Sequence, residues 1–387
     1  MNEFGNKRTI LILGCKNYPA FSSEKVISGG MEIYVWELVK YLKYNYNIIL
    51  ISGYSYSSDD SIKVISVPVI GGLLLQPISL FIATLFVCTS LLIKREKIEL
   101  INAQTPLFAL IAYMFKIIFK IPYVVSVHIY ASSSAHIGML SGVYGVIERI
   151  VLSNADRVIS AGYKLRLHLL EKYKIDTDRL VVIHPGMDVI NTNNELHGNK
   201  YQRMFAGDDA CKLLFLGRLI KENGIMDILE AMTYLKNESI KLLIAGNGNL
   251  GRRIKSYVKR KDIHGKIVFL GVVRGKEKYE LLQHVDIIIR TSYHEVFPVA
   301  YLEAIANGKP VIATPVGDTE YLARVTGAVT LVPVKSPREV ARTIKKLMNN
   351  KKLTSKEINK CNAFISKTGW KKQAEMTHSV FKSILEI

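Results

Sequence analysis

Residues 285–314 read VDIIIRTSYHEVFPVAYLEAIANGKPVIAT and contain the clearest indication of the fold. The short run Val285–Ile289, which is apolar apart from Asp286, is typical of a buried strand, and Val311–Ala313 predicts the next strand. Between them, Pro298 suits the first turn of a helix and Asn307-Gly308 suits its end. A strand, a helix and a second strand in this order predict a parallel βαβ unit.

The same alternation extends over the rest of the chain. Further strands are expected at Thr9–Leu13, Asn47–Ser52, Lys63–Val69, Glu99–Asn102, Tyr123–Val127, Arg157–Ile159, Val181–Ile183, Lys212–Leu216, Lys241–Ala245 and Ile267–Leu270. Helices are expected at Met31–Leu42, Ile78–Ile93, Ile225–Leu235 and Trp370–Ile387. The polar stretch 190–210 predicts a linker. We therefore expect two doubly wound α/β domains, 1–188 and 189–368, with a final helix 369–387 that packs back on the first domain.

The composition is that of a globular protein, with 49% hydrophobic and 22% charged residues among 387. The formal net charge of +19 favours anionic partners such as nucleotides or acidic lipid headgroups, and no motif predicts nucleic-acid binding. Four distant cysteines without a CxxC pair predict reduced thiols, with neither a metal module nor a disulfide framework. The polar N-terminus predicts no signal peptide, so a cytoplasmic location is expected.

The stretch from Val64 to Ile93 contains no charged residue. Its length would suffice for a membrane span, but Gly71-Gly72 and Pro77 interrupt it, so a buried or interfacial helix is favoured. Basic residues follow directly and recur on the next amphipathic stretch, at Lys94, Arg95, Lys97, Lys116 and Lys120. Apolar surface beside basic side chains suits contact with the inner membrane face, whereas a core helix with a solvated end remains an equal alternative.

The turn Glu295–Pro298 leads into the helix expected within residues 285–314. Backbone N–H groups at the start of that helix would face the carboxyl edge of the sheet, which makes a site for an anion such as a pyrophosphate. Glu295 and Glu303 are suited to accept hydrogen bonds from sugar or ribose hydroxyls there, because carboxylates do not bind phosphate.

Glu295 and Glu303, separated by seven residues, resemble the Glu-x7-Glu motif of retaining glycosyltransferases of family 4. The surrounding LEAIANGKPVIATPVG is similar to that family as well. The resemblance implies the GT-B architecture, in which two facing Rossmann-like domains enclose an interdomain cleft. It places the nucleotide-activated sugar on the second domain and the acceptor on the first.

A second segment, Phe215–Gly224, resembles the family's strand-to-helix turn with Gly217-Arg218 at the strand end. The family carries a lysine just before the later glycine, where this chain has Asn223. The resemblance implies that Arg218 neutralises the donor diphosphate. Either Lys221 or Asn223 is then expected to take the place of the missing lysine.

Weaker resemblances complete the predicted site. Gly30 lies in Ser28-Gly29-Gly30-Met31-Glu32, which is similar to the family's Gly-Gly loop, and His128 follows a strand where the family has a histidine near the donor sugar and the acceptor. The donor-binding set implied by the resemblance is Glu303, Gly30, Lys221, Asn223, Gly217, Val296, Phe297, Pro298, Gly246 and Leu270.

The resemblance implies a retaining transfer from a nucleotide-sugar donor to a glycan or lipid-linked acceptor, with no metal or other cofactor. Arg218, Glu295 and His128 are the expected catalytic residues. Two alternatives remain open: a glycoside hydrolase that uses the two glutamates, and a catalytically silent partner of a membrane glycosylation complex. The missing lysine at Asn223 keeps the second alternative open.

Overall fold

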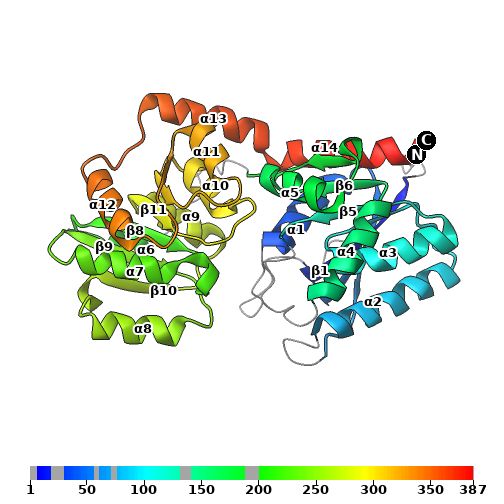
Figure 1. Cartoon of the computed structure of the whole chain (residues 1–387), viewed down its shortest axis with the longest axis horizontal. Coiled ribbons are helices and arrows are strands. Elements are labelled where there is room, and N and C mark those ends of the chain that lie inside the picture. The colour runs from blue at the N-terminus through cyan, green and yellow to red at the C-terminus, as the bar shows by residue number, and fades with distance from the viewer. Residues whose placement is uncertain are drawn as a thin grey trace. The chain divides into compact units, whose positions relative to one another are not determined.

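The computed structural model describes residues 7–18, 30–55, 61–70, 76–130, 141–187 and 200–386. The chain divides into two compact units (Figure 1). Met1–Gly186 together with Trp370–Ile387 forms the N-terminal unit, and Met187–Gly369 forms the C-terminal unit. Each unit is a parallel sheet covered by helices on both faces, which is the doubly wound arrangement that the alternating sequence predicted.

The sheet of the N-terminal unit has the strand order β3-β2-β1-β4-β5-β6-β7, and every neighbouring pair is parallel. Its strands are β1 (Thr9–Tyr18), β2 (Asn47–Ser55), β3 (Lys63–Ser66), β4 (Leu100–Ala103), β5 (Tyr123–Val127), β6 (Arg157–Ser160) and β7 (Leu180–Val182). Its helices are α1 (Gly30–Leu42), α2 (Gln76–Ile93), α3 (Pro106–Phe119), α4 (Ser141–Asn154), α5 (Tyr163–Tyr173) and α14 (Trp370–Leu385).

The sheet of the C-terminal unit has the order β10-β9-β8-β11-β12-β13 and is also parallel throughout. Its strands are β8 (Cys211–Leu216), β9 (Ile240–Ala245), β10 (Ile267–Gly271), β11 (Ile287–Arg290), β12 (Val311–Ala313) and β13 (Val329–Leu331). Its helices are α6 (Lys200–Met204), α7 (Ile225–Tyr234), α8 (Gly251–Arg260), α9 (Gly275–Gln283), α10 (Val299–Ala306), α11 (Thr319–Thr326), α12 (Pro337–Met348) and α13 (Ser355–Thr368).

The central strands are largely apolar segments of the sequence, and they lie in the middle of each sheet. All five residues of β5 are buried, as are the first five of β8, because helices cover both faces of each sheet. Side chains of β8, β9, β11 and α7 share one core in the C-terminal unit, and those of β1, β2, α1 and α14 share another in the N-terminal unit.

The strand order reverses between β8 and β11 in the C-terminal unit and between β1 and β4 in the N-terminal unit. At such a reversal the connections leave to opposite faces, so the loops that follow the two strands part and leave a crevice at the carboxyl edge of the sheet. The loop after β8 contains Arg218 and Asn223, and the loop after β11 contains Glu295. The topology therefore places these three predicted residues at one edge of one sheet.

Three local details differ from the expectations. β1 runs on to Tyr18 because Gly14, at φ +91°, lets the strand continue through a shift in register between Ile12 and Cys15. The short strand β13 was not predicted, since its three residues lack a distinctive pattern. Pro298 caps α10 from outside the helix instead of standing in its first turn.

The final helix α14 packs against α1 within the N-terminal unit. Its first residue, Trp370, is buried and meets the ring of Tyr34 edge-on, with ring centroids 5.8 Å apart. A side chain on Gly186 would place its Cβ 2.7 Å from the Trp370 Cα, so only glycine lets the two chain segments pass so closely. Among the described residues, no helix has both the length and the hydrophobicity needed to cross a bilayer.

Candidate active site

The loop after β8 packs tightly against the loop after β11. Gly224 has a left-handed φ of +69°, and a Cβ there would lie 1.9 Å from the carbonyl oxygen of Thr291. The Thr291 hydroxyl in turn donates a hydrogen bond to the Gly224 carbonyl oxygen over 2.8 Å. The glycine of the predicted Lys-Glu-Asn-Gly segment is therefore required by packing, and it fixes the position of Asn223 directly before it.

The loop that carries Glu295 is held from several sides. The Tyr293 N–H donates to the Glu222 carbonyl oxygen over 2.7 Å, and the Asp318 N–H donates to the Val296 carbonyl oxygen over 3.0 Å. The Tyr301 hydroxyl donates to the Arg290 carbonyl oxygen, also over 3.0 Å. These bonds come from the loop after β8, the loop after β12 and α10, so the site is pre-organised by its neighbours.

Both predicted glutamates form ion pairs. Arg290 Nη2 lies 2.9 Å from Glu295 Oε2, and the Lys278 ammonium of α9 pairs with Glu303 of α10. The side chains of all four residues are between 10% and 17% exposed. Carboxylate oxygens accept hydrogen bonds, so each glutamate can accept one from a hydroxyl group in addition to its ion pair.

Asn223 does not face outward as a substitute for the missing lysine. Its side chain is buried: Nδ2 donates to the Arg218 carbonyl oxygen over 2.7 Å, and Oδ1 accepts from Arg290 Nη2 over 2.7 Å. The amide therefore connects the two loops. Arg218 and Lys221 are both exposed, which leaves their charges accessible.

Arg290 was missed by the sequence reasoning, although it contacts Asn223 and Glu295 at once. The sequence could have indicated it, because Arg290 is a cation at the end of the buried strand IIIR, and such a position lies at the carboxyl edge of a parallel sheet. Lys278 was also missed, and its helix offers no comparable signal.

Gly246 lies where the loop after β9 meets the loop after β8. At φ +152°, a Cβ on Gly246 would stand 1.9 Å from the Gly217 carbonyl oxygen. Gly246 is thus needed for packing whether or not it touches a nucleotide. Leu270 lies on β10, the edge strand of the same sheet, so its predicted contact with a nucleotide base stays a prediction.

The start of α10 follows Glu295 in the chain. Val296, Phe297 and Pro298 are buried, and the helix runs from Val299 to Ala306. The first N–H groups of a helix have no acceptor within it, so this end carries a partial positive charge. The predicted backbone contacts with a diphosphate stay a prediction, but the helix start lies in the loop that positions Glu295.

Two family models match the chain. The model described as "Glycosyltransferase Family 4" matches residues 28–190, and the model described as "Glycosyl transferases group 1" matches residues 202–366. An uncharacterized glycosyltransferase of Methanocaldococcus jannaschii, MJ1607, is 26% identical over 306 residues, which cover 76% of this chain and 77% of the relative.

Solved structures agree on the fold. HepE of Anabaena in complex with UDP superposes with a TM-score of 0.75 at 16% identity, covering 98% of this chain and 100% of that one. A sucrose-phosphate synthase of Thermosynechococcus elongatus reaches a TM-score of 0.80 at 17% identity, with the same coverage. The chain belongs to the family 4-like GT-B glycosyltransferases. The expected fold class and family are thereby confirmed.

In the N-terminal unit of this glycosyltransferase, His128 follows β5 and belongs to a chain of polar side chains. Its Nε2 lies 2.9 Å from Gln104 Oε1, and the Gln104 amide donates to Asn102, whose own amide donates to the Ser126 hydroxyl. Because Gln104 offers its oxygen, Nε2 must carry the imidazole proton. Burial lowers the pKa of His128 from 6.5 to about 4, so the ring is neutral near pH 7.

These polar partners of His128 were not predicted. Gln104 directly follows β4, and Asn102 is a buried polar residue within that strand. Polar residues at the ends of adjacent parallel strands were a usable signal for both. The role of His128 toward donor and acceptor stays a prediction.

The predicted Gly-Gly loop is described only in part. Gly30 is the first residue of α1 and is exposed, whereas Ser28 and Gly29 lie outside the described residues. A Cβ on Gly30 would meet no atom within 4 Å among the described residues, so packing in this structure does not require glycine there.

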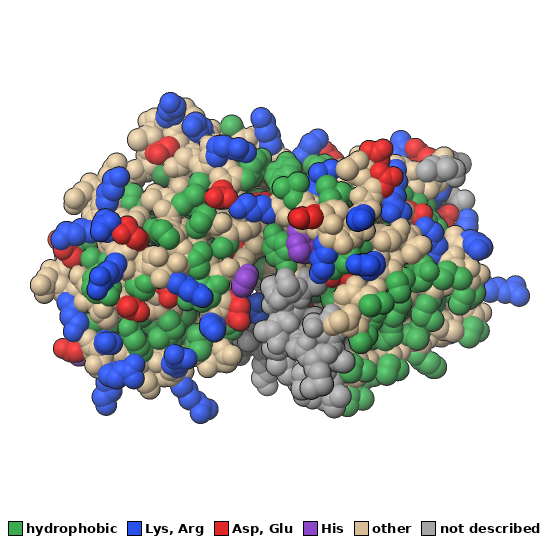
Figure 2. All heavy atoms as spheres, in the orientation of Figure 1, with side chains coloured by type: hydrophobic (Ala, Val, Ile, Leu, Met, Phe, Trp, Pro, Cys, Tyr) green, Lys and Arg blue, Asp and Glu red, His purple; other side chains and the backbone are tan. Residues whose placement is uncertain are grey.

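The N-terminal unit also presents a broad hydrophobic surface, which we call the apolar face. Figure 2 shows hydrophobic side chains gathered over α2 and α3. The exposed large hydrophobic side chains of α2 and α3 are Ile78, Ile82, Phe86, Ile93, Met114, Ile117, Ile118 and Phe119. Such a large patch on one face is typical of an interaction surface.

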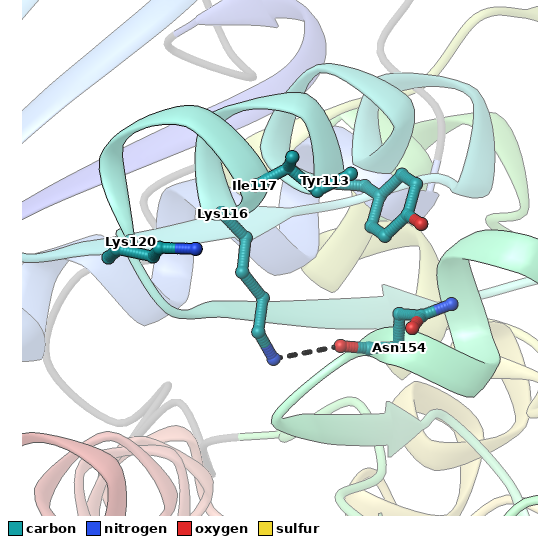
Figure 3. Close-up of a pocket in the computed structure, with 5 residues that line it drawn as sticks. All are labelled: Tyr113, Lys116, Ile117, Lys120 and Asn154. Carbon is teal, nitrogen blue, oxygen red and sulfur yellow. Dashed lines mark hydrogen bonds between the residues drawn. The ribbon is translucent and has the colours of Figure 1, made fainter.

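A surface pocket of about 310 Å³ lies between α3 and the end of α4, lined by Tyr113, Lys116, Ile117, Lys120 and Asn154 (Figure 3). Lys116 donates to the Asn154 carbonyl oxygen over 3.0 Å and pairs with Asp156, so its charge is partly compensated. Lys120 is exposed at the end of α3 and leaves a positive charge beside the apolar face.

Proposed function

We propose that this glycosyltransferase transfers a sugar from a nucleotide-sugar donor to a glycan or lipid-linked acceptor, with retention at the anomeric carbon. The observation that carries the proposal is a set of charged residues around the β8–β11 reversal. Glu295 pairs with Arg290 in the loop after β11, and the exposed Arg218 lies in the loop after β8. Glu303 of α10, the helix that follows Glu295, pairs with Lys278. Anabaena HepE, which has the same fold, was solved with UDP and with UDP-glucose, and this supports a nucleotide-sugar donor.

Each residue of the cluster has a distinct proposed task. Arg218 neutralises the diphosphate as negative charge develops on it, and Glu295 orients the sugar through its hydroxyls. Glu303, held by Lys278, accepts hydrogen bonds from the ribose. The bond between the anomeric carbon and the phosphate oxygen breaks, and a bond to the acceptor oxygen forms on the same face. The acceptor proton passes to the departing phosphate.

The ion pairs argue against a hydrolase. Hydrolysis of a simple glycoside by two carboxylates needs one of them protonated as a general acid, which usually requires a raised pKa. Here both glutamates instead form ion pairs, Glu295 with Arg290 and Glu303 with Lys278. The arrangement suits binding of hydroxyls better than donation of a proton.

The acceptor proposed here is lipid-linked, and the apolar face is proposed to rest on an anionic membrane surface. The sequences of α2 and α3 contain no acidic residue, while the exposed cations Lys94, Arg95 and Lys120 lie at their ends. Apolar side chains bordered by cations suit the headgroup region of an anionic bilayer. An alpha-monoglucosyldiacylglycerol synthase of Streptococcus pneumoniae, 28% identical over 57% of this chain and 52% of its own, supports a lipid acceptor.

The donor is tested by thermal shift of the full chain with a panel of sugar nucleotides, because a ligand that binds the folded state raises its apparent stability. One sugar nucleotide is expected to stabilise the protein and to be consumed in the presence of a lipid acceptor. NMR of the product should show the donor's anomeric configuration. Inversion would refute retention, and binding without any consumption of donor would favour the catalytically silent alternative.

The membrane contact is tested by flotation with vesicles of phosphatidylcholine and phosphatidylglycerol. The wild-type protein is expected to float with anionic vesicles, and Phe86→Glu is expected to abolish flotation. Ile358→Glu, which changes an exposed isoleucine of α13 in the C-terminal unit, is the matched control and should float like the wild type. A wild-type protein that stays at the bottom would contradict the proposal.

A further inference from the structure

The Arg290 guanidinium is the point where the parts of the candidate site meet. Its Nη2 donates to Asn223 Oδ1 over 2.7 Å and lies 2.9 Å from Glu295 Oε2. A Cβ placed on Gly217 would stand 3.7 Å from its Cζ and Nη1. One side chain from the end of β11 therefore touches the glutamate of its own loop and reaches the loop after β8.

The guanidinium has N–H groups that take no part in these contacts. An arginine carries five N–H groups, and the two contacts just described both involve Nη2. Arg290 Nε is buried and has no hydrogen-bond partner among the residues that the structure describes. A buried polar atom without a partner is uncommon, and a bound ligand is one reason for it. Gly217 has no side chain to place beside Nη1, from which a Cβ would stand 3.7 Å.

Asn223 is turned into the protein and cannot act as a second group on a diphosphate. Its Nδ2 donates to the Arg218 carbonyl oxygen, and its Oδ1 receives Arg290. The amide thus orients the guanidinium and is a positioning residue. Lys221 lies in the same loop, where its side chain is exposed on the single turn between β8 and α7.

We propose that Arg290 supplies the second positive charge on the donor diphosphate, with Arg218 as the first. This inference rests on the proposed nucleotide-sugar donor. Arginine suits the task because its planar fork can bind a carboxylate and a phosphate at the same time. Arg290 lies between Glu295 and Gly217, so it would contact both the glutamate that orients the sugar and the departing diphosphate.

The test is calorimetric titration of the full-length protein with UDP, GDP and ADP and with the matching nucleosides. Arg290→Gln removes the charge but keeps a group that can donate to Asn223. We expect the affinity for the preferred nucleoside diphosphate to fall about tenfold or more, while the affinity for its nucleoside changes less than about twofold. Arg253→Gln, an exposed arginine of α8, is the charge-matched control and should bind both like the wild type.

A second variant separates a lost charge from a damaged loop. In the double variant Arg290→Gln with Asn223→Lys, a cation returns to the same pocket from the other loop. Recovery of diphosphate affinity, with an unchanged affinity for the nucleoside, would support the proposal. The double variant also tests the charge directly if Arg290→Gln alone folds poorly.

Two results would overturn the inference while leaving the proposed function intact. Either Arg290→Gln weakens the nucleoside and the diphosphate equally, or Lys221→Gln alone causes the diphosphate-specific loss. A wild-type protein that binds none of the nucleoside diphosphates would refute the proposed donor, and this inference with it.

Discussion

Replacing Gly246 by alanine tests whether the loops of the candidate site are held together by close backbone approach. The new Cβ would lie 1.9 Å from the Gly217 carbonyl oxygen, whereas real Cβ contacts essentially never fall below 3.0 Å. The two loops must therefore separate by about 1 Å. In addition, the φ of +152° is one that a residue with a side chain rarely adopts.

The expected cost has two parts. An unfavourable backbone conformation costs about 1–3 kcal/mol, and the bond from the Gly217 N–H to the Ala245 carbonyl oxygen, at 3.0 Å, is worth about 1 kcal/mol if it breaks. We expect a loss of about 2–4 kcal/mol in stability. Turnover should fall by about 100-fold, because displacement of Gly217 also displaces Arg218.

Urea denaturation followed by circular dichroism, together with a turnover assay, measures both effects. Gly251→Ala is the control, since Gly251 begins α8 and a Cβ there meets no described atom within 4 Å. The control should be as stable as the wild type or slightly more stable. A Gly246→Ala protein with the wild-type urea midpoint and wild-type turnover would refute the packing argument.

Three further substitutions follow from the site. Glu303→Gln should weaken donor binding about tenfold, because Lys278 loses its charged partner and the ribose is left with one neutral acceptor oxygen in place of a carboxylate; unchanged donor affinity in calorimetry would contradict this. Arg218→Ala should lower kcat about 100-fold while changing donor affinity much less, and equal losses in both would count against a role at the leaving group. The pKa of His128 is about 4 in the folded protein, below the ordinary value of 6.5. Between these two pH values the unfolded chain binds more protons than the folded protein, so the stability of the wild type falls as the pH drops from 6.5 to 4. His128→Gln should remove up to about 3 kcal/mol of that loss of stability, measured from urea denaturation at pH 7.5 and at pH 4.5. An identical loss of stability in the variant would show that His128 is not the group responsible.

The fold was largely readable from the sequence because its strands are buried on both faces and separated by helices. Runs such as those at β5 and β8 have no polar alternation, which marks a parallel sheet. The short strand β13 could not be predicted, since three residues carry no periodicity and depend on pairing with β12. The extension of β1 past Gly14 likewise depends on its neighbour β2.

The site was readable only where a residue's own neighbours in the chain define it. Glu295, Glu303 and Arg218 follow from motif spacing; Arg218 and Glu295 lie in loops at one sheet edge, and Glu303 lies on α10, which follows. The partners of these residues come from elsewhere in the chain: Lys278 reaches Glu303 from another helix, and Arg290 reaches Asn223 across 67 positions. Pairings of this kind are set by the fold and cannot be read from local sequence.

Hydrogen exchange of the full chain with and without a sugar nucleotide locates the bound donor along the backbone, so it shows whether the donor binds at the β8 and β11 loops. We expect the donor selected by thermal shift to slow exchange in the loops 217–224 and 290–300. Slower exchange elsewhere in the chain, with these two loops unchanged, would contradict it.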